Sequence, residues 1–171
     1  MNVDPSSNIV RFLIVILLQI FVCSAINLFG FVSPAVYLLA LLLLPLELPK
    51  SAQYLIGFFT GLVIDMFAHT LGVNAAACLI MMFVRPYLVR LLNGRNSVEG
   101  VDRPEPGVKD FKWILIYVML LSFIHQFLVV MLETSSFHNF GHTMLSVFCS
   151  TLFTAFVLIC VEYIFYSTKR N

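Results

Sequence analysis

Small and polar side chains recur every four residues within one apolar stretch of the chain. The series consists of Gln53, Gly57, Gly61, Asp65 and His69. Residues spaced in this way share one slowly drifting face of an α-helix. Gly57 and Gly61 form a GxxxG motif, which lets two helix backbones approach closely. The stripe predicts either packing inside the protein or a contact face for a helix of a partner.

Asp65 is the carboxylate of this stripe, and its immediate neighbours in the sequence are apolar. A carboxylate that is removed from water must gain a partner or bind a proton. We expect Asp65 to pair with His125, which should lie at a similar depth on another helix, or to cap the backbone near Gly72. The alternative is that Asp65 accepts hydrogen bonds from backbone amides of the turn at residues 70–74.

Other patterns that would support catalysis are missing from the sequence. His138 and His142 have a spacing that suits metal ligands on a helix, but Gly141 indicates a turn there, so no metal site is predicted. The nucleophile, HExxH, paired-glutamate and phosphate-loop patterns are absent. The four cysteines lie in apolar runs without CxxC spacing, which is typical of buried thiols. We therefore expect neither an enzyme nor a cofactor.

The composition indicates that most of the chain lies in lipid and not in water. Of the 171 residues, 60% are hydrophobic and 11% are charged, whereas soluble domains are about one quarter charged. The mean hydropathy is +0.96. A water-soluble globule is excluded, and a net charge of +1 argues against nucleic-acid binding.

The apolar runs predict an all-α integral membrane protein, a single domain over residues 1–171 built as one bundle of six transmembrane helices. About 20 apolar residues cross a bilayer as a helix. The predicted spans are residues 9–29, 31–46, 52–68, 73–92, 113–132 and 143–166. The second run stops at Pro45 and Pro49. No signal peptide is predicted, because the first run is too long and no A-x-A site follows it.

The basic residues indicate the orientation of this bundle. With six spans, all ten Lys and Arg residues fall on one side or at its helix ends. An excess of Lys and Arg marks the cytoplasmic side, so both termini are expected there. The loop of residues 93–112 lies on the same side, and its basic and acidic residues balance. This loop is either a connector or a docking site for a cytoplasmic partner.

The segment from Gly61 to Ala75 reads GLVIDMFAHTLGVNA and resembles the signature of the rod-shape-determining MreD family. That family typically shows a glycine, apolar residues and an aspartate, then a short polar turn and a Leu-Gly pair before the next helix. Gly61, Asp65 and Gly72 match this pattern, whereas the family varies at the position of His69. The chain length and the small loops agree with the family as well.

The resemblance implies a non-enzymatic protein of the bacterial inner (cytoplasmic) membrane. It would be a scaffold of the rod or elongation complex, regulating cell shape and lateral peptidoglycan synthesis. The implied partners are the bitopic protein MreC, a RodA-like glycosyltransferase, a class B penicillin-binding protein and the MreB filament. The implied bundle is similar to the S components of energy-coupling-factor transporters.

An alternative function is the substrate-binding component of a vitamin transporter. In that case Asp65, Asn74, His125 and the span of residues 113–132 would line a pocket near the outer side.

Overall fold

The chain is described here from a computed structural model, for residues 12, 14–19, 34–46, 48–93, 110–133 and 140–170. Every regular element in these ranges is helical. The elements are a helical stretch at residues 14–19, α2 (Leu38–Leu42), α3 (Lys50–Ala68), α4 (Val73–Asn93), α5 (Phe111–Glu133) and α6 (Phe140–Arg170). The predicted all-α class is confirmed for this part of the chain.

Four helices are long and apolar enough to cross a bilayer within the described ranges. They are Lys50–Ala68, Val73–Asn93, Phe111–Glu133 and Thr143–Glu162. Each coincides with a predicted span to within a few residues at either end. The chain therefore has the helices of a multi-pass membrane protein.

The prediction of six spans is wrong at residues 31–46. In the described part of that run, Leu38–Leu42 form a helix of only five residues, and all five are buried. Such a helix is about 8 Å long, far less than a bilayer core. The run is apolar because the other helices surround it. The first predicted span, residues 9–29, lies mostly outside the described residues.

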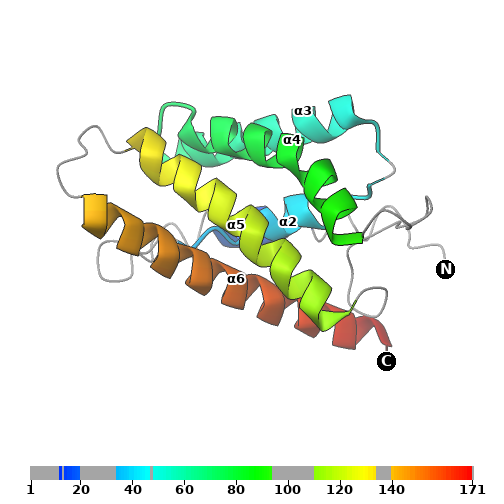
Figure 1. Ribbon diagram of the computed structural model, residues 1–171. Coiled ribbons are helices and arrows are strands. Elements are labelled where there is room, and N and C mark those ends of the chain that lie inside the picture. Colours follow the sequence, from blue (N-terminus) through cyan, green and yellow to red (C-terminus); the bar gives the residue numbers. More distant parts are fainter. Residues whose placement is uncertain are drawn as a thin grey trace.

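Helices that are neighbours in the sequence pack side by side, α3 against α4, α4 against α5 and α5 against α6. Figure 1 shows α3 and α4 together, with α5 crossing between this pair and α6. The α2 segment lies inside the bundle, where Tyr37, Leu38 and Leu41 are almost completely buried. The hydrophobic core therefore forms around a short internal helix.

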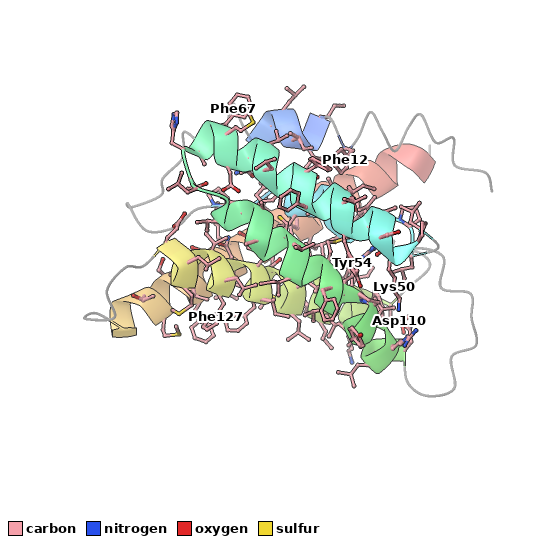
Figure 2. The ribbon with its side chains drawn as sticks, turned by 90° about the horizontal axis from the view of Figure 1, so that it is seen from above. Phe12, Lys50, Tyr54, Phe67, Asp110 and Phe127 are labelled. Carbon is pink, nitrogen blue, oxygen red and sulfur yellow. The ribbon has the colours of Figure 1, made fainter. Side chains whose placement is uncertain are left out.

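Three of the described basic residues lie at one end of the bundle. Lys50 begins α3, Arg90 lies in the last turn of α4, and Lys112 lies in the first turn of α5. Figure 2 shows Lys50 and Asp110 at the same end, with Phe67 at the opposite end beside the α3–α4 turn. The cytoplasmic placement of the basic end remains a prediction. Most of the loop at residues 93–112 lies outside the described residues.

Candidate functional site

The GxxxG face of α3 is covered by α4 of the same chain. A Cβ atom added at Gly61 would lie 2.5 Å from Cα of Ala75 and 2.5 Å from the backbone oxygen of Asn74. At Gly57, the added Cβ would lie 2.7 Å from Cγ of Met82. Both glycines therefore allow the close approach of two backbones. Of the two interpretations of this face, packing inside the protein is the one that the structure shows.

Asp65 caps the beginning of α4 from the last turns of α3. It is 3% exposed, and its Oδ2 accepts a hydrogen bond from the backbone N of Ala75 at 2.8 Å. Its Oδ1 accepts from both the backbone N and Nδ2 of Asn74, each at 3.0 Å, and also from the Thr70 hydroxyl. The first N–H groups of a helix lack partners within the helix, so an acidic cap satisfies them. The capping alternative for Asp65 is confirmed.

The turn between α3 and α4 depends on two residues with positive φ. His69 ends α3 in the left-handed conformation at a φ of 56°, and its N–H donates to the backbone oxygen of Asp65. Gly72 has a φ of 80°, a value that glycine adopts without the steric cost of a Cβ atom. The side chain of His69 is exposed, so this end of the stripe does not contribute to the buried packing of α3.

Asp65 and His125 are connected through two residues that lie between them. Asn74, which donates to Asp65, accepts through Oδ1 from the Tyr37 hydroxyl at 3.0 Å. The same hydroxyl lies 2.8 Å from Nε2 of His125. Among the described residues, the direct pair predicted between Asp65 and His125 is not formed. A relay of hydrogen bonds replaces it.

This relay determines where the protons lie. A carboxylate only accepts, so Nδ2 of Asn74 faces Asp65 and Oδ1 faces Tyr37. The single hydroxyl proton of Tyr37 then goes to Asn74, so we infer that Nε2 of His125 donates to the Tyr37 oxygen. A neutral imidazole with its proton on Nε2 has a free acceptor at Nδ1. Within the described residues, this buried Nδ1 atom has no hydrogen-bond partner.

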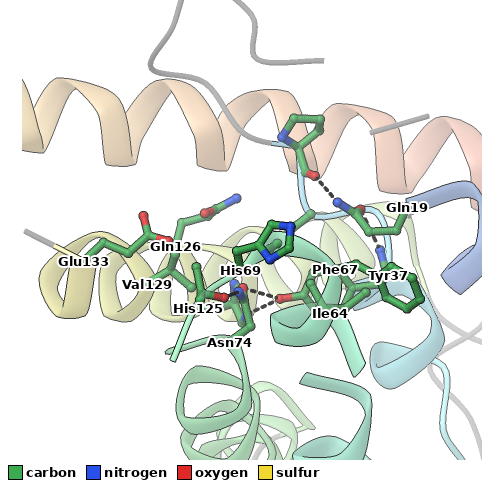
Figure 3. Close-up of a pocket in the computed structure, with 14 residues that line it drawn as sticks. Gln19, Tyr37, Ile64, Phe67, His69, Asn74, His125, Gln126, Val129 and Glu133 are labelled. Atoms are coloured by element: carbon green, nitrogen blue, oxygen red, sulfur yellow. Dashed lines mark hydrogen bonds between the residues drawn. The ribbon is translucent and has the colours of Figure 1, made fainter. Parts of the chain in front are cut away.

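A cavity of about 490 Å³ lies beside the relay, at the end of the bundle that carries the α3–α4 turn. Its walls come from the helical stretch at residues 14–19, from the residues just before α2, from the end of α3 with the α3–α4 turn and the first turn of α4, and from the second half of α5 (Figure 3). The polar lining residues are Gln19, Tyr37, His69, Thr70, Asn74, His125, Gln126 and Glu133, and the apolar ones are Pro34, Ala35, Ile64, Phe67, Ala68 and Val129.

The transporter alternative predicted a pocket at this place. Asn74 and His125 line the cavity, as that alternative requires. Asp65 does not belong to the lining, because its carboxylate is turned to the first amides of α4. Tyr37 was not identified from the sequence, since a tyrosine in an apolar run is common in membrane helices.

Arg85 forms a second buried polar cluster, near the opposite end of α2. It is 0% exposed, and its Nε donates to the Tyr117 hydroxyl at 2.7 Å. Its Nη1 donates to Oε1 of Gln53 at 3.1 Å. Its Nη2 donates to the backbone oxygen of Leu42 at 3.0 Å and to that of Leu44. The guanidinium thereby holds the C-terminal end of α2 and the residues just after it against α4.

The role of Arg85 is not predicted from the sequence, where this residue counts as one of the basic charges at a helix end. The available signal was its position inside the apolar run, well before Arg90 and Asn93. Charged residues inside a membrane span usually face the interior of the bundle. Gln53, noted in the stripe on α3, is one of its partners.

Comparisons with known proteins identify no relative. No protein-family model, no curated protein and no solved structure matches the chain.

Proposed function

We propose that the protein is a non-enzymatic scaffold of the bacterial inner membrane, acting in the rod or elongation complex. It regulates cell shape and lateral peptidoglycan synthesis by binding an MreC-like bitopic protein. A RodA-like glycosyltransferase, a class B penicillin-binding protein and an MreB-like filament belong to the same complex. Both termini lie in the cytoplasm, on the side of the basic helix ends.

The observation that supports this proposal is the geometry of the segment that resembles the MreD family. Gly61 allows the close approach of α4, Asp65 caps its first amides, and Gly72 provides the positive φ of the turn. Each of the three matching residues thus meets a different requirement of one helical hairpin. This supports the resemblance more strongly than their spacing alone.

The partner must bind a surface other than the Gly57–Gly61 face, because α4 covers that face. In the described part of the chain, most residues belong to membrane-length helices. Contacts with a bitopic partner are therefore made largely within the bilayer. Association there depends on close packing and on hydrogen bonds worth about 1 kcal/mol each.

Depletion of the protein in the source bacterium tests the proposed role. We expect rods to become round and the labelling of new lateral wall by a fluorescent D-amino acid to be lost. Expression of the wild-type chain, or of the surface variant Gly141→Ala, should restore both. Unchanged rods and wall labelling after depletion would overturn the proposal.

The cavity gives the transporter alternative a specific observation in its favour, since two of the residues named for that pocket line it. The same depletion strain distinguishes the two functions. A transport component would leave cell shape unchanged and would make growth depend on an added vitamin. Loss of shape that no supplement relieves supports the scaffold.

A further inference from the structure

We infer that an anionic phospholipid binds along the exposed line where α3 and α4 meet, at the basic end of the bundle. This line, the lipid seam, runs from Lys50 and Arg90 at the end of the bundle to Phe58 and Leu79 farther inside the membrane. The phosphate of the lipid lies between Lys50 and Arg90, and one acyl chain follows the rest of the seam. The inference goes beyond the scaffold role and does not depend on it, because lipid binding is measured on the purified protein without partners.

Two contacts between α3 and α4 determine how these antiparallel helices are aligned. The rings of Tyr54 on α3 and Phe83 on α4 have their centroids 6.1 Å apart. One turn farther along α3, Gly57 faces Met82, since a Cβ atom added at Gly57 would lie 2.7 Å from its Cγ. Both contacts indicate the same alignment, in which a step forward along α3 corresponds to an equal step back along α4.

Steps of four residues from the Tyr54–Phe83 pair lead to the head of the seam, because side chains four residues apart share a helix face. They place Lys50 beside Tyr87, whose ring centroid lies 5.6 Å from that of Phe83. Figure 2 shows Lys50 and Tyr54 at the same end of α3. Arg90 follows Tyr87 after less than one turn of α4. The two basic side chains therefore lie on neighbouring helices with an aromatic ring beside them.

The seam faces the surroundings of the bundle and not its core. On α4, Phe83 is 52% exposed and Tyr87 is 56% exposed. A step of four residues in the other direction places Phe58 of α3 beside Leu79 of α4, and both are exposed. From Leu79 to Tyr87, α4 rises by about 12 Å. An acyl chain thus finds a continuous apolar surface of this length directly below the two basic residues.

The charges around the head of the seam favour a negatively charged ligand. Lys50 and Arg90 are both exposed. Asp65 is the acidic residue of α3 and α4, and it is buried at the opposite end, where α4 begins. Asp110 lies at the basic end (Figure 2), but it precedes α5, which packs against the buried side of α4. The seam itself therefore carries two positive charges without a carboxylate between α3 and α4.

A phosphodiester at the membrane surface matches these groups. Lysine and arginine both form charge-assisted hydrogen bonds with phosphate oxygens. Tyrosine rings such as that of Tyr87 prefer the level of the headgroups, where one end is apolar and the other is wet. A zwitterionic lipid carries an ammonium group next to its phosphate, and two cations repel it. Each basic residue near an anionic headgroup increases binding by about fivefold, so the seam should select a lipid with net negative charge.

Native mass spectrometry of the purified full chain in detergent tests this selection. The protein is titrated with equal amounts of dioleoyl-phosphatidylglycerol and dioleoyl-phosphatidylethanolamine, which differ in charge and not in their chains. We expect the first bound lipid to be phosphatidylglycerol at least about tenfold more often. The soluble headgroup glycerophosphoglycerol should not displace it, because it lacks the acyl chain that covers the seam. Equal binding of the two lipids, or displacement by the soluble headgroup, would overturn the inference.

Three variants locate the bound lipid. Lys50→Gln and Arg90→Gln should each reduce the preference for phosphatidylglycerol by about fivefold, and the double variant should abolish it. Lys112→Gln is the matched control, since it removes the same charge from an exposed residue at the same end of the bundle, on α5. Its preference should equal that of the wild type. An equal loss in Lys112→Gln and Lys50→Gln, at unchanged melting temperatures, would show attraction by the net charge alone and would overturn the site.

Discussion

The carboxylate of Asp65 and the backbone amide of Ala75 face each other across the α3–α4 turn, with 2.8 Å between Oδ2 and N. Through its other oxygen, the same carboxylate also accepts from the backbone and the side chain of Asn74. One acidic residue on α3 thereby accepts hydrogen bonds from the backbone N–H groups in the first turn of α4. It also orients the side-chain amide of Asn74. The same carboxylate therefore stabilises the α3–α4 hairpin and forms the first member of the hydrogen-bond relay to His125.

The variant Asp65→Ala should lower the free energy of unfolding by about 1–3 kcal/mol, because it removes the cap and leaves buried donors without an acceptor. The measurement is the thermal unfolding of the purified protein in a mild detergent. Met66→Ala is the matched control, since Met66 is the next residue in α3 and is 72% exposed. Equal melting temperatures for the two variants would contradict the capping role.

Three glycine-to-alanine variants should differ in a definite order. Gly61→Ala should destabilise most, by about 1–3 kcal/mol, because its Cβ would meet the backbone of α4. Gly57→Ala should cost less, since it meets the flexible side chain of Met82. Gly141→Ala, which meets nothing within 4 Å, should cause no loss. Thermal unfolding ranks the three variants, and a Gly61→Ala protein as stable as Gly141→Ala would contradict the packing described.

The variant Arg85→Lys should destabilise the protein by about 2–4 kcal/mol although it keeps the positive charge, because a lysine cannot serve all four acceptors. Those acceptors belong to α2 and the residues just after it, to α3 and to α5. Arg90→Lys is the control, as Arg90 is exposed on the same helix. The amount of folded protein recovered by size-exclusion chromatography and its melting temperature are the readouts. A wild-type result for Arg85→Lys would show that the cluster does not hold α2.

Cysteine labelling tests the topology that follows from the four candidate spans and the basic helix ends. In a background without the native cysteines, Leu71→Cys in the α3–α4 turn should react with a membrane-impermeant maleimide added to intact spheroplasts. Lys112→Cys, at the start of α5, should react only after the membrane is opened. The reverse pattern would contradict the cytoplasmic placement of the basic end.

The four long helices were predictable because an apolar run long enough to cross a bilayer is typical of a transmembrane helix. The run at residues 31–46 was misassigned for the same reason: a segment buried on all sides by helices is as apolar as one that faces lipid. Pro45 marks the end of this run without indicating which environment surrounds it. Hydropathy does not distinguish the interior of a membrane protein from the lipid around it.

The candidate site was predictable only where contacts are local in the sequence. Asp65 and the amides that it caps are separated by one turn, so the capping alternative was available from the sequence. The relay to His125 requires Tyr37, which approaches from a segment far away along the chain. The partners of Arg85 are equally distant, and only the packing of four helices brings them together.

The central claim, that the protein is a scaffold of the elongation complex, is tested most directly by affinity purification of the tagged full chain in a mild detergent. The co-purified proteins are then identified by mass spectrometry. The scaffold function predicts recovery of a single-span, coiled-coil MreC-like protein together with the wall-synthesis enzymes, and the same recovery from the surface variant Gly141→Ala. Recovery of a pair of ATPases with a second membrane subunit, and of no wall-synthesis protein, would contradict it.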